Sequence, residues 1–154
     1  MLLSHEVYKR IKSLDINPVL RVIDRLKFID SNGKCAWVTA PDSQAPSELL
    51  DLVRSAKLGG VYKRMFCRKL MPRQGILPHI DDWIPQEEKW RRFHIPLISD
   101  PSIKMRWPDD KVELYLEPGY LYEVRVDRVH EVVNECDTIE RIHIQLDMEN
   151  ATIL

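Results

Sequence analysis

Two histidines, a carboxylate and an arginine in this chain could together build a metal centre. His79 and Asp81 are separated by one residue. His130 lies much later in the chain, and Arg141 follows it by eleven positions. Two histidines and a carboxylate can occupy one face of an Fe(II) ion and leave its other positions open for substrates and oxygen. Arg141 could then pair, through charge-assisted hydrogen bonds, with the far carboxylate of a keto acid bound to that ion.

The same ligand types leave other interpretations open. Hydrolytic zinc also accepts two histidines and a carboxylate. Its HExxH pattern, which lies on a helix, is absent from this sequence. A lone His-x-Asp pair is also common where both side chains simply pack in a core or face water. The presence of Arg141 downstream of His130 favours iron over both alternatives.

The elements that must hold these residues read as β-strands. On a strand, alternate side chains point to the same side, so His79 and Asp81 would share one face. In the last predicted strand, a polar series alternates with an aliphatic one: Arg141, His143 and Gln145 against Ile142, Ile144 and Leu146. If Arg141 points into a barrel, the aliphatic side chains point outward and need cover.

The chain changes character near residue 60. Before it, apolar residues spaced by three and four predict helices over residues 7–14, 20–26 and 46–57, the last ended by Gly59-Gly60. A short strand is possible at residues 35–40. After residue 60, the predicted strands are Val61–Leu70, Leu77–Asp81, Trp90–Ile98, Ile103–Trp107, Val112–Glu117, Tyr120–Val126, His130–Asn134 and Ile139–Met148. Turn residues separate them, which indicates a mainly β sandwich or barrel with N-terminal helices available to cover one sheet.

Composition indicates a single domain that spans residues 1–154. Of the 154 residues, 44% are hydrophobic and 31% charged, and 23 Lys+Arg against 24 Asp+Glu give a formal net charge of −1. This balance offers no electrostatic basis for binding nucleic acid or an anionic membrane. No segment has the pattern of a signal peptide or of a membrane span. Three separated cysteines without CxxC spacing suit a reducing compartment, so we expect a cytoplasmic protein.

Three segments, in order, resemble the aspartyl/asparaginyl β-hydroxylase family of Fe(II)- and 2-oxoglutarate-dependent dioxygenases. They are Leu70-Met71-Pro72 with Pro78-His79-Ile80-Asp81, then Arg92-Phe93-His94-Ile95-Pro96-Leu97, then His130-Glu131-Val132-Val133-Asn134 with Arg141. The resemblance covers about residues 61–148. It implies a double-stranded β-helix, a cupin-like jelly roll, over that range, with residues 1–60 as a mostly helical buttress. It also places the strands of His130 and Arg141 in opposing sheets.

The resemblance further implies a role for each site residue. His79, Asp81 and His130 match the catalytic iron ligands, and Arg141 matches the arginine that binds the 5-carboxylate of 2-oxoglutarate. His94 matches a histidine that contacts this cosubstrate, although a packed core histidine is the alternative. Arg92 would hold the cosubstrate or an acidic group of the substrate, and Arg68 is a looser match in a pocket-lining strand. The implied cofactors are Fe(II), 2-oxoglutarate as cosubstrate, and O₂.

Other features leave two possibilities each. Residues 82–89, with Trp83, could form a lid over the pocket or a solvated loop. His143 could line the pocket floor or make a structural hydrogen bond. The substrate would be an amino acid, an aspartyl or asparaginyl residue of a peptide or protein, or a lipid acyl chain, and the arginines favour a carboxylate-bearing one. The alternative function is a non-oxygenase cupin metalloprotein, such as an isomerase, hydrolase or metal-dependent sensor, which would not need Arg141.

Overall fold

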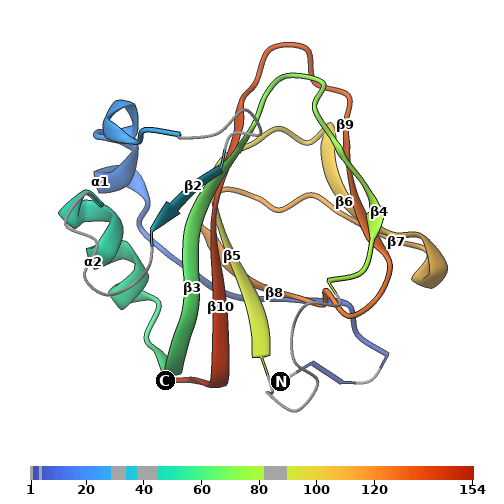
Figure 1. Ribbon diagram of the computed structural model, residues 1–154, viewed down its shortest axis with the longest axis horizontal. Helices are drawn as coiled ribbons and strands as arrows, with labels where there is room; N and C mark the ends of the chain where they lie inside the picture. The colour runs from blue at the N-terminus through green and yellow to red at the C-terminus, as the bar shows by residue number, and fades with distance from the viewer. Residues whose placement is uncertain (1, 4, 29–33, 38–44, 82–89) are drawn as a thin grey trace.

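The described part of the chain forms two antiparallel β-sheets that face each other, with short helices on the outer side of the larger sheet (Figure 1). This computed structural model describes residues 2–3, 5–28, 34–37, 45–81 and 90–154. In spatial order, the larger sheet contains β1 (Tyr8–Ser13), β8 (Tyr120–Val124), β5 (Trp90–Ile98), β10 (Arg141–Ile153), β3 (Leu58–Leu70) and β2 (Lys34–Trp37). The smaller sheet contains β4 (Ile76–His79), β9 (His130–Asn134), β6 (Ile103–Trp107) and β7 (Val112–Leu114). The helices are α1 (Asn17–Leu20) and α2 (Ser47–Ser55), with 3₁₀ turns at Ile23–Arg25 and Pro108–Asp110.

The main hydrophobic core lies between the larger sheet and the helices. The aliphatic side chains of β10 and the buried side chains of α2 belong to this one core, which includes Ile144 and Leu146 together with Leu49 and Leu52. Burying an aliphatic side chain of this size stabilises a fold by about 1.5–3 kcal/mol. The expectation that the aliphatic side of the last strand points outward and is covered by a helix is therefore confirmed.

The other face of β10 points into the space between the sheets, and it is polar. The side chains of Arg141, His143, Gln145 and Asp147 are all buried there. Two smaller apolar clusters join the sheets on either side of this space. One connects Trp107 of the smaller sheet to Tyr122 and Val124 of β8, and the other connects Ile103 and Val132 to Leu70 of β3. The interior between the sheets is thus a polar compartment closed at its flanks by apolar contacts.

The strand predictions after residue 60 hold, with shifts at the ends. All eight expected strands are present, and β5, β6 and β9 have the expected bounds. β9 belongs to the smaller sheet and β10 to the larger one, as the resemblance implies for His130 and Arg141. β10 runs on to Ile153, and β3 begins at Leu58, because these two strands pair along most of their length.

The N-terminal prediction is wrong in part. Residues 7–14 do not form a helix, because Tyr8–Ser13 pairs as β1 with the edge of the larger sheet at β8. Three apolar residues over eight positions do not distinguish a helix from an edge strand, and here the pairing with β8 decides. Residues 20–26 form the end of α1 and a 3₁₀ turn in place of one helix.

The predicted helix over residues 46–57 is present as α2, but the two glycines do not end it. The helix stops at Ser55, and Gly59 and Gly60 lie inside β3. The expected strand at residues 35–40 corresponds to β2, and residues 38–40 are outside the described part of the chain. Within the described ranges, no helix has both the length and the apolar character needed to cross a bilayer.

Candidate functional site

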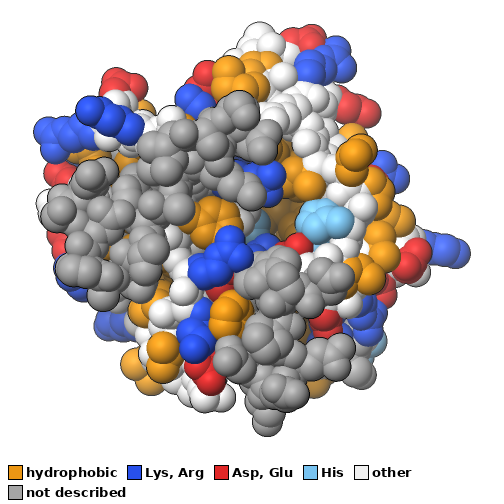
Figure 2. Space-filling view, viewed as in Figure 1, with side chains coloured by type: hydrophobic (Ala, Val, Ile, Leu, Met, Phe, Trp, Pro, Cys, Tyr) orange, Lys and Arg blue, Asp and Glu red, His pale blue; other side chains and the backbone are white. Residues whose placement is uncertain are grey.

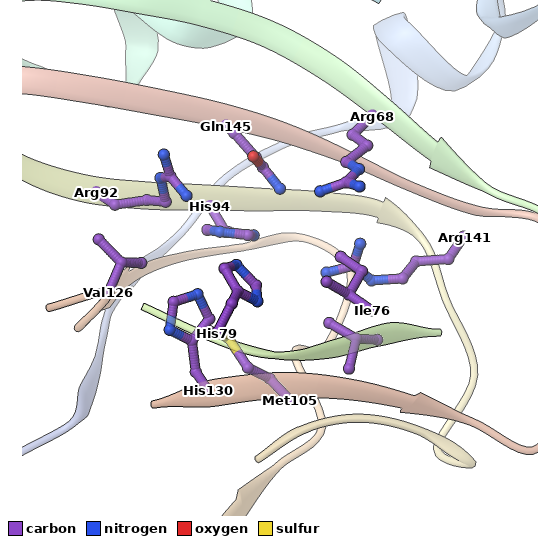
Figure 3. A pocket seen from close by; sticks show the side chains of 11 residues that line it. Arg68, Ile76, His79, Arg92, His94, Met105, Val126, His130, Arg141 and Gln145 are labelled. Atoms are coloured by element: carbon purple, nitrogen blue, oxygen red, sulfur yellow. The ribbon is translucent and has the colours of Figure 1, made fainter. Parts of the chain in front are cut away.

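A hollow opens on the surface where the polar compartment meets β4. Figure 2 shows it, with histidine and Lys/Arg side chains at its rim and in its depth. The inner cavity is narrow, with a volume of about 30 Å³. Figure 3 shows the polar side chains that line it: Arg68, Arg92, His94, Arg141 and Gln145 from the larger sheet, and His79 and His130 from the smaller one. Gln145 and the apolar lining residues were not predicted as site residues.

The proposed metal ligands come together at one edge of this cavity. His79 at the end of β4 lies directly opposite His130 at the start of β9, and their ring centroids are 4.3 Å apart. Asp81 follows β4, and its backbone N–H donates to the carbonyl of Val126. The distance from Asp81 Oδ1 to His79 Nε2 is 3.1 Å, and that from Asp81 Oδ2 to His130 Nε2 is 4.0 Å. One donor atom from each residue fits within 4.8 Å of the others, so the cluster could hold a metal ion.

The backbone orients both imidazole rings for this task. Nδ1 of His79 lies 2.8 Å from the carbonyl oxygen of Leu77, and Nδ1 of His130 lies 2.8 Å from that of Arg128. A carbonyl oxygen can only accept, so each Nδ1 carries the hydrogen and donates it. In the neutral ring, Nε2 then keeps its lone pair and faces Asp81. Burial lowers the pKa of His130, which favours this neutral form.

Arg92 is engaged by two carboxylates at the inner side of the cluster. Its Nη1 donates to Asp81 Oδ2 at 2.6 Å, while its Nε and Nη2 donate to the two oxygens of Asp147 at 2.7 and 3.0 Å. Burial opposes the charged form of Arg92, but Asp147 and Asp81 outweigh it and raise the pKa. The predicted contact of Arg92 with a cosubstrate or substrate stays a prediction. Asp147 was missed, although it continues the polar alternation of the last strand.

Arg141 is buried, and one of its donors has no partner among the described residues. Its side chain is 2% exposed, and its Nη1 is buried without a hydrogen bond to any described residue. Burial, with a smaller contribution from the neighbouring charge of Arg68, lowers the pKa of Arg141 to about 9. A buried donor without a partner costs about 1–3 kcal/mol, and more when it is charged. An anion in the cavity would satisfy this group.

His94 and His143 form a pair beside Arg141. Their Nδ1 atoms are 3.1 Å apart, so one ring donates to the other. Burial, with the positive charge of Arg141 next in importance, holds the pKa of both rings well below the ordinary value, so both are neutral. Of the two possibilities for His143, a structural hydrogen bond is the one observed. His94 lines the cavity, so its contact with a cosubstrate remains open as a prediction.

The prediction of a lid over the cavity is not tested by the structure. Residues 82–89, including Trp83, lie outside the described residues. The described part of the cavity mouth is a wider hollow of about 960 Å³, which shares Arg68, His79 and Arg92 with the inner cavity. Arg64, Phe66 and Leu77 add to its lining.

The sequence matches no family model and no curated protein. Its structure, in contrast, is similar to several solved ones. The viral collagen prolyl hydroxylase vCPH from Paramecium bursaria Chlorella virus-1, as a 2-oxoglutarate complex, superposes with a TM-score of 0.66 at 11% identity, over 94% of this chain and 96% of that one. The chain has the fold of this hydroxylase.

Two further structures agree. The non-heme monooxygenase ThoJ, as a nickel complex, gives a TM-score of 0.65 at 10% identity, over 97% of this chain and 76% of that one. AviO1 from Streptomyces viridochromogenes Tue57 gives 0.55 at 11% identity, over 97% and 92%. At these identities the likeness concerns the fold alone. None of these three structures is described as an aspartyl/asparaginyl β-hydroxylase. The resemblance to that family therefore stays a proposal.

Proposed function

We propose that this protein is an Fe(II)- and 2-oxoglutarate-dependent dioxygenase that hydroxylates an unactivated C–H bond. The observation that carries the proposal is the buried Arg141, whose unpartnered Nη1 lies in the same cavity as the cluster of His79, Asp81 and His130. A fold does not gain stability from such an arginine, because no carboxylate of the described residues offsets its desolvation. An acid that binds a metal at one end and Arg141 at the other would offset it.

The donor set of the cluster fits a ferrous ion. Two imidazoles and one carboxylate, on adjacent strand ends of the smaller sheet, are the ligands typical of non-heme Fe(II) sites with open positions. When bound there, Fe(II) would supply the activation of O₂ that is coupled to oxidative decarboxylation of 2-oxoglutarate to succinate and CO₂. His79, Asp81 and His130 are the proposed ligands.

The residues of the larger sheet would bind and orient the cosubstrate. Arg141 would pair with its 5-carboxylate, and the nearby charge of Arg68 would strengthen the attraction. His94, neutral and buried, would hydrogen-bond it without adding charge. The enclosed position of these side chains excludes most water, which strengthens each electrostatic contact.

The finer assignments are also proposals. We interpret the two facing sheets as a double-stranded β-helix, which the similarity to vCPH and ThoJ supports. The short sequence motifs support an aspartyl, asparaginyl or amino-acid substrate, and Arg64 and Arg68 at the cavity mouth favour a carboxylate-bearing one. We place the protein in the cytoplasm on the basis of its cysteine usage.

The test is turnover of the keto acid. Purified protein with Fe(II), ascorbate and 2-oxoglutarate should release succinate slowly even without a primary substrate. His79→Ala and His130→Ala should abolish both succinate release and metal binding, because each removes one of the proposed ligands. Wild-type iron affinity in both variants would refute the assignment of the metal site.

A further inference from the structure

We propose that Asp147 is a positioning residue for the metal centre. It holds Arg92 so that this arginine binds one oxygen of Asp81 and leaves the other oxygen for the metal. The inference rests on the metal site proposed above and adds to it a residue that touches neither the metal nor the cosubstrate. Figure 3 shows Arg92 on the larger sheet beside the cavity that His79 and His130 line.

Asp147, Arg92 and Asp81 are joined by a series of hydrogen bonds, which we call the relay. Asp147 on β10 and Arg92 on β5 lie directly opposite each other in the sheet, and they make two hydrogen bonds, one to each carboxylate oxygen. Such a bidentate pair fixes the plane of the guanidinium group. Nη1 is then left pointing at Asp81, 2.6 Å from Oδ2. The relay therefore connects the larger sheet to the metal-binding end of the smaller one.

Burial makes these contacts strong and specific. Asp147 is fully buried, and Arg92 and Asp81 are nearly so. Charges out of water are costly unless their hydrogen bonds are made, so removal of one partner disturbs the others. Arg64, whose Nε lies 3.8 Å from Asp147, contributes a second positive charge from the more exposed side.

Asp81 is left with one oxygen for the metal. Its Oδ2 accepts from Arg92 and lies 4.0 Å from Nε2 of His130, while Oδ1 lies 3.1 Å from Nε2 of His79. Without the charge of Asp147, Nε and Nη2 of Arg92 would lose the carboxylate to which they donate. The guanidinium group would then interact more strongly with Asp81 and compete with the metal for that carboxylate.

The experiment measures Co(II) binding to the full chain by titration, with the visible absorption of the bound ion as a report on its coordination. Asp147→Asn keeps the size of the side chain and removes its charge. We expect its affinity for Co(II) to fall about tenfold or more, the usual range for residues that orient metal ligands. The absorption of the bound ion should change as well. Wild-type affinity and spectrum in this variant would overturn the proposal.

The chain offers a matched control. Glu123 of β8 is a buried carboxylate that accepts from Nε of Arg91 at 2.9 Å. Because Arg91 precedes Arg92 on β5, it points to the opposite face of the sheet. Glu123→Gln thus removes a comparable buried charge away from the cluster, and it should leave Co(II) affinity unchanged. An equal loss in Glu123→Gln would mean that any buried charge of the sheet has this effect, and the proposal would be overturned.

A double-mutant cycle tests whether Asp147 acts through Asp81. Asp81→Ala keeps both histidines and binds Co(II) more weakly; adding Asp147→Asn to it should cause no further loss. The same further loss in both backgrounds would contradict the relay. Where Asp147→Asn does not fold, Arg92→Lys takes its place with Arg91→Lys as control, since lysine cannot make all three contacts. If the wild-type chain itself binds no Co(II), the proposed metal site fails, whereas unchanged affinity in the variants removes only the role of Asp147.

Discussion

At the scale of single residues, the site depends on histidines that burial keeps neutral. His94 and His143 are fully buried, and their pKa is held well below the ordinary value, mainly by burial and next by the charge of Arg141. Neutral rings can both donate and accept, which is what a hydrogen-bonded pair and a cosubstrate contact require. A protonated pair would repel itself and Arg141.

The lowered pKa of these two histidines should make the free energy of unfolding depend on pH. A histidine that is neutral when folded binds a proton more readily when unfolded, so protonation favours the unfolded chain. The free energy of unfolding should therefore be constant above about pH 6.5 and fall below it, by up to about 1.4 kcal/mol per pH unit for each such histidine.

Urea denaturation measured between pH 7.5 and 5.5 checks this expectation. His143→Gln removes one of the titrating groups, so the slope below pH 6.5 should be smaller in that variant than in the wild type. A free energy of unfolding that is the same at both ends of this range would show that folding does not lower the pKa of these histidines.

The proposed metal ligands could be predicted from the sequence, whereas the ion pairs around them could not. The residue types and their order in the chain were enough to predict a metal site with an arginine for the cosubstrate, formed by His79, Asp81, His130 and Arg141. The pairing of Arg92 with Asp147 could not be predicted, because it depends on which residue of β10 lies opposite Arg92 in β5. A shift of that register by one residue would turn Asp147 to the hydrophobic face.

At the scale of the elements, β10 organises the molecule. Its two faces serve different purposes, because the aliphatic side chains pack on α2 and the polar ones line the compartment. That alternation is strict enough to be read from the sequence. β1 was not predicted as a strand, because it lies at the edge of the sheet and only its pairing with β8 determines its conformation.

The pairing of β10 with β3 depends on Gly60. This residue has a φ of +108°, and a Cβ atom added to it would lie 2.7 Å from the carbonyl oxygen of Glu149 and 2.8 Å from that of Asn150. Both contacts are with backbone atoms, at the irregular end of the strand pair. Rotation of a side chain therefore cannot relieve them.

We expect Gly60→Ala to destabilise the fold by more than the backbone conformation alone costs. A left-handed conformation costs an alanine about 1–2 kcal/mol, and the clash with β10 adds to it. Gly119→Ala is the matched control, since Gly119 has a φ of +90° but its nearest atom would be 3.7 Å away. Urea denaturation of both variants measures the difference. Equal losses would indicate that the β3–β10 end relaxes without cost.

At the scale of the whole molecule, the fold separates stability from chemistry. The main core lies outside the larger sheet, and apolar clusters close the flanks of the compartment. The interior is therefore available for charged residues. Asp147 and Asp81 are balanced by Arg92, whereas Arg141 and Arg68 are close enough for their like charges to lower the pKa of Arg141. This part of the interior is suited to an incoming dianion.

The most direct test of the central claim is calorimetric binding of 2-oxoglutarate in the presence of Mn(II), which replaces iron without turnover. Wild-type protein should bind the keto acid only with the metal present. Arg141→Gln should weaken binding by about tenfold to a hundredfold, the value of a hydrogen bond to a charged group. Arg106→Gln, on the exposed side of β6, should bind as the wild type does.

The stability of Arg141→Gln without ligand serves as the check on folding. Because the arginine is buried with an unpartnered donor, its replacement should leave the free energy of unfolding unchanged or higher. Loss of 2-oxoglutarate binding in a variant that folds as well as the wild type is the result we predict. Unchanged affinity in Arg141→Gln would contradict the account, and wild-type protein that binds no 2-oxoglutarate would favour a non-oxygenase cupin that uses the metal without this cosubstrate.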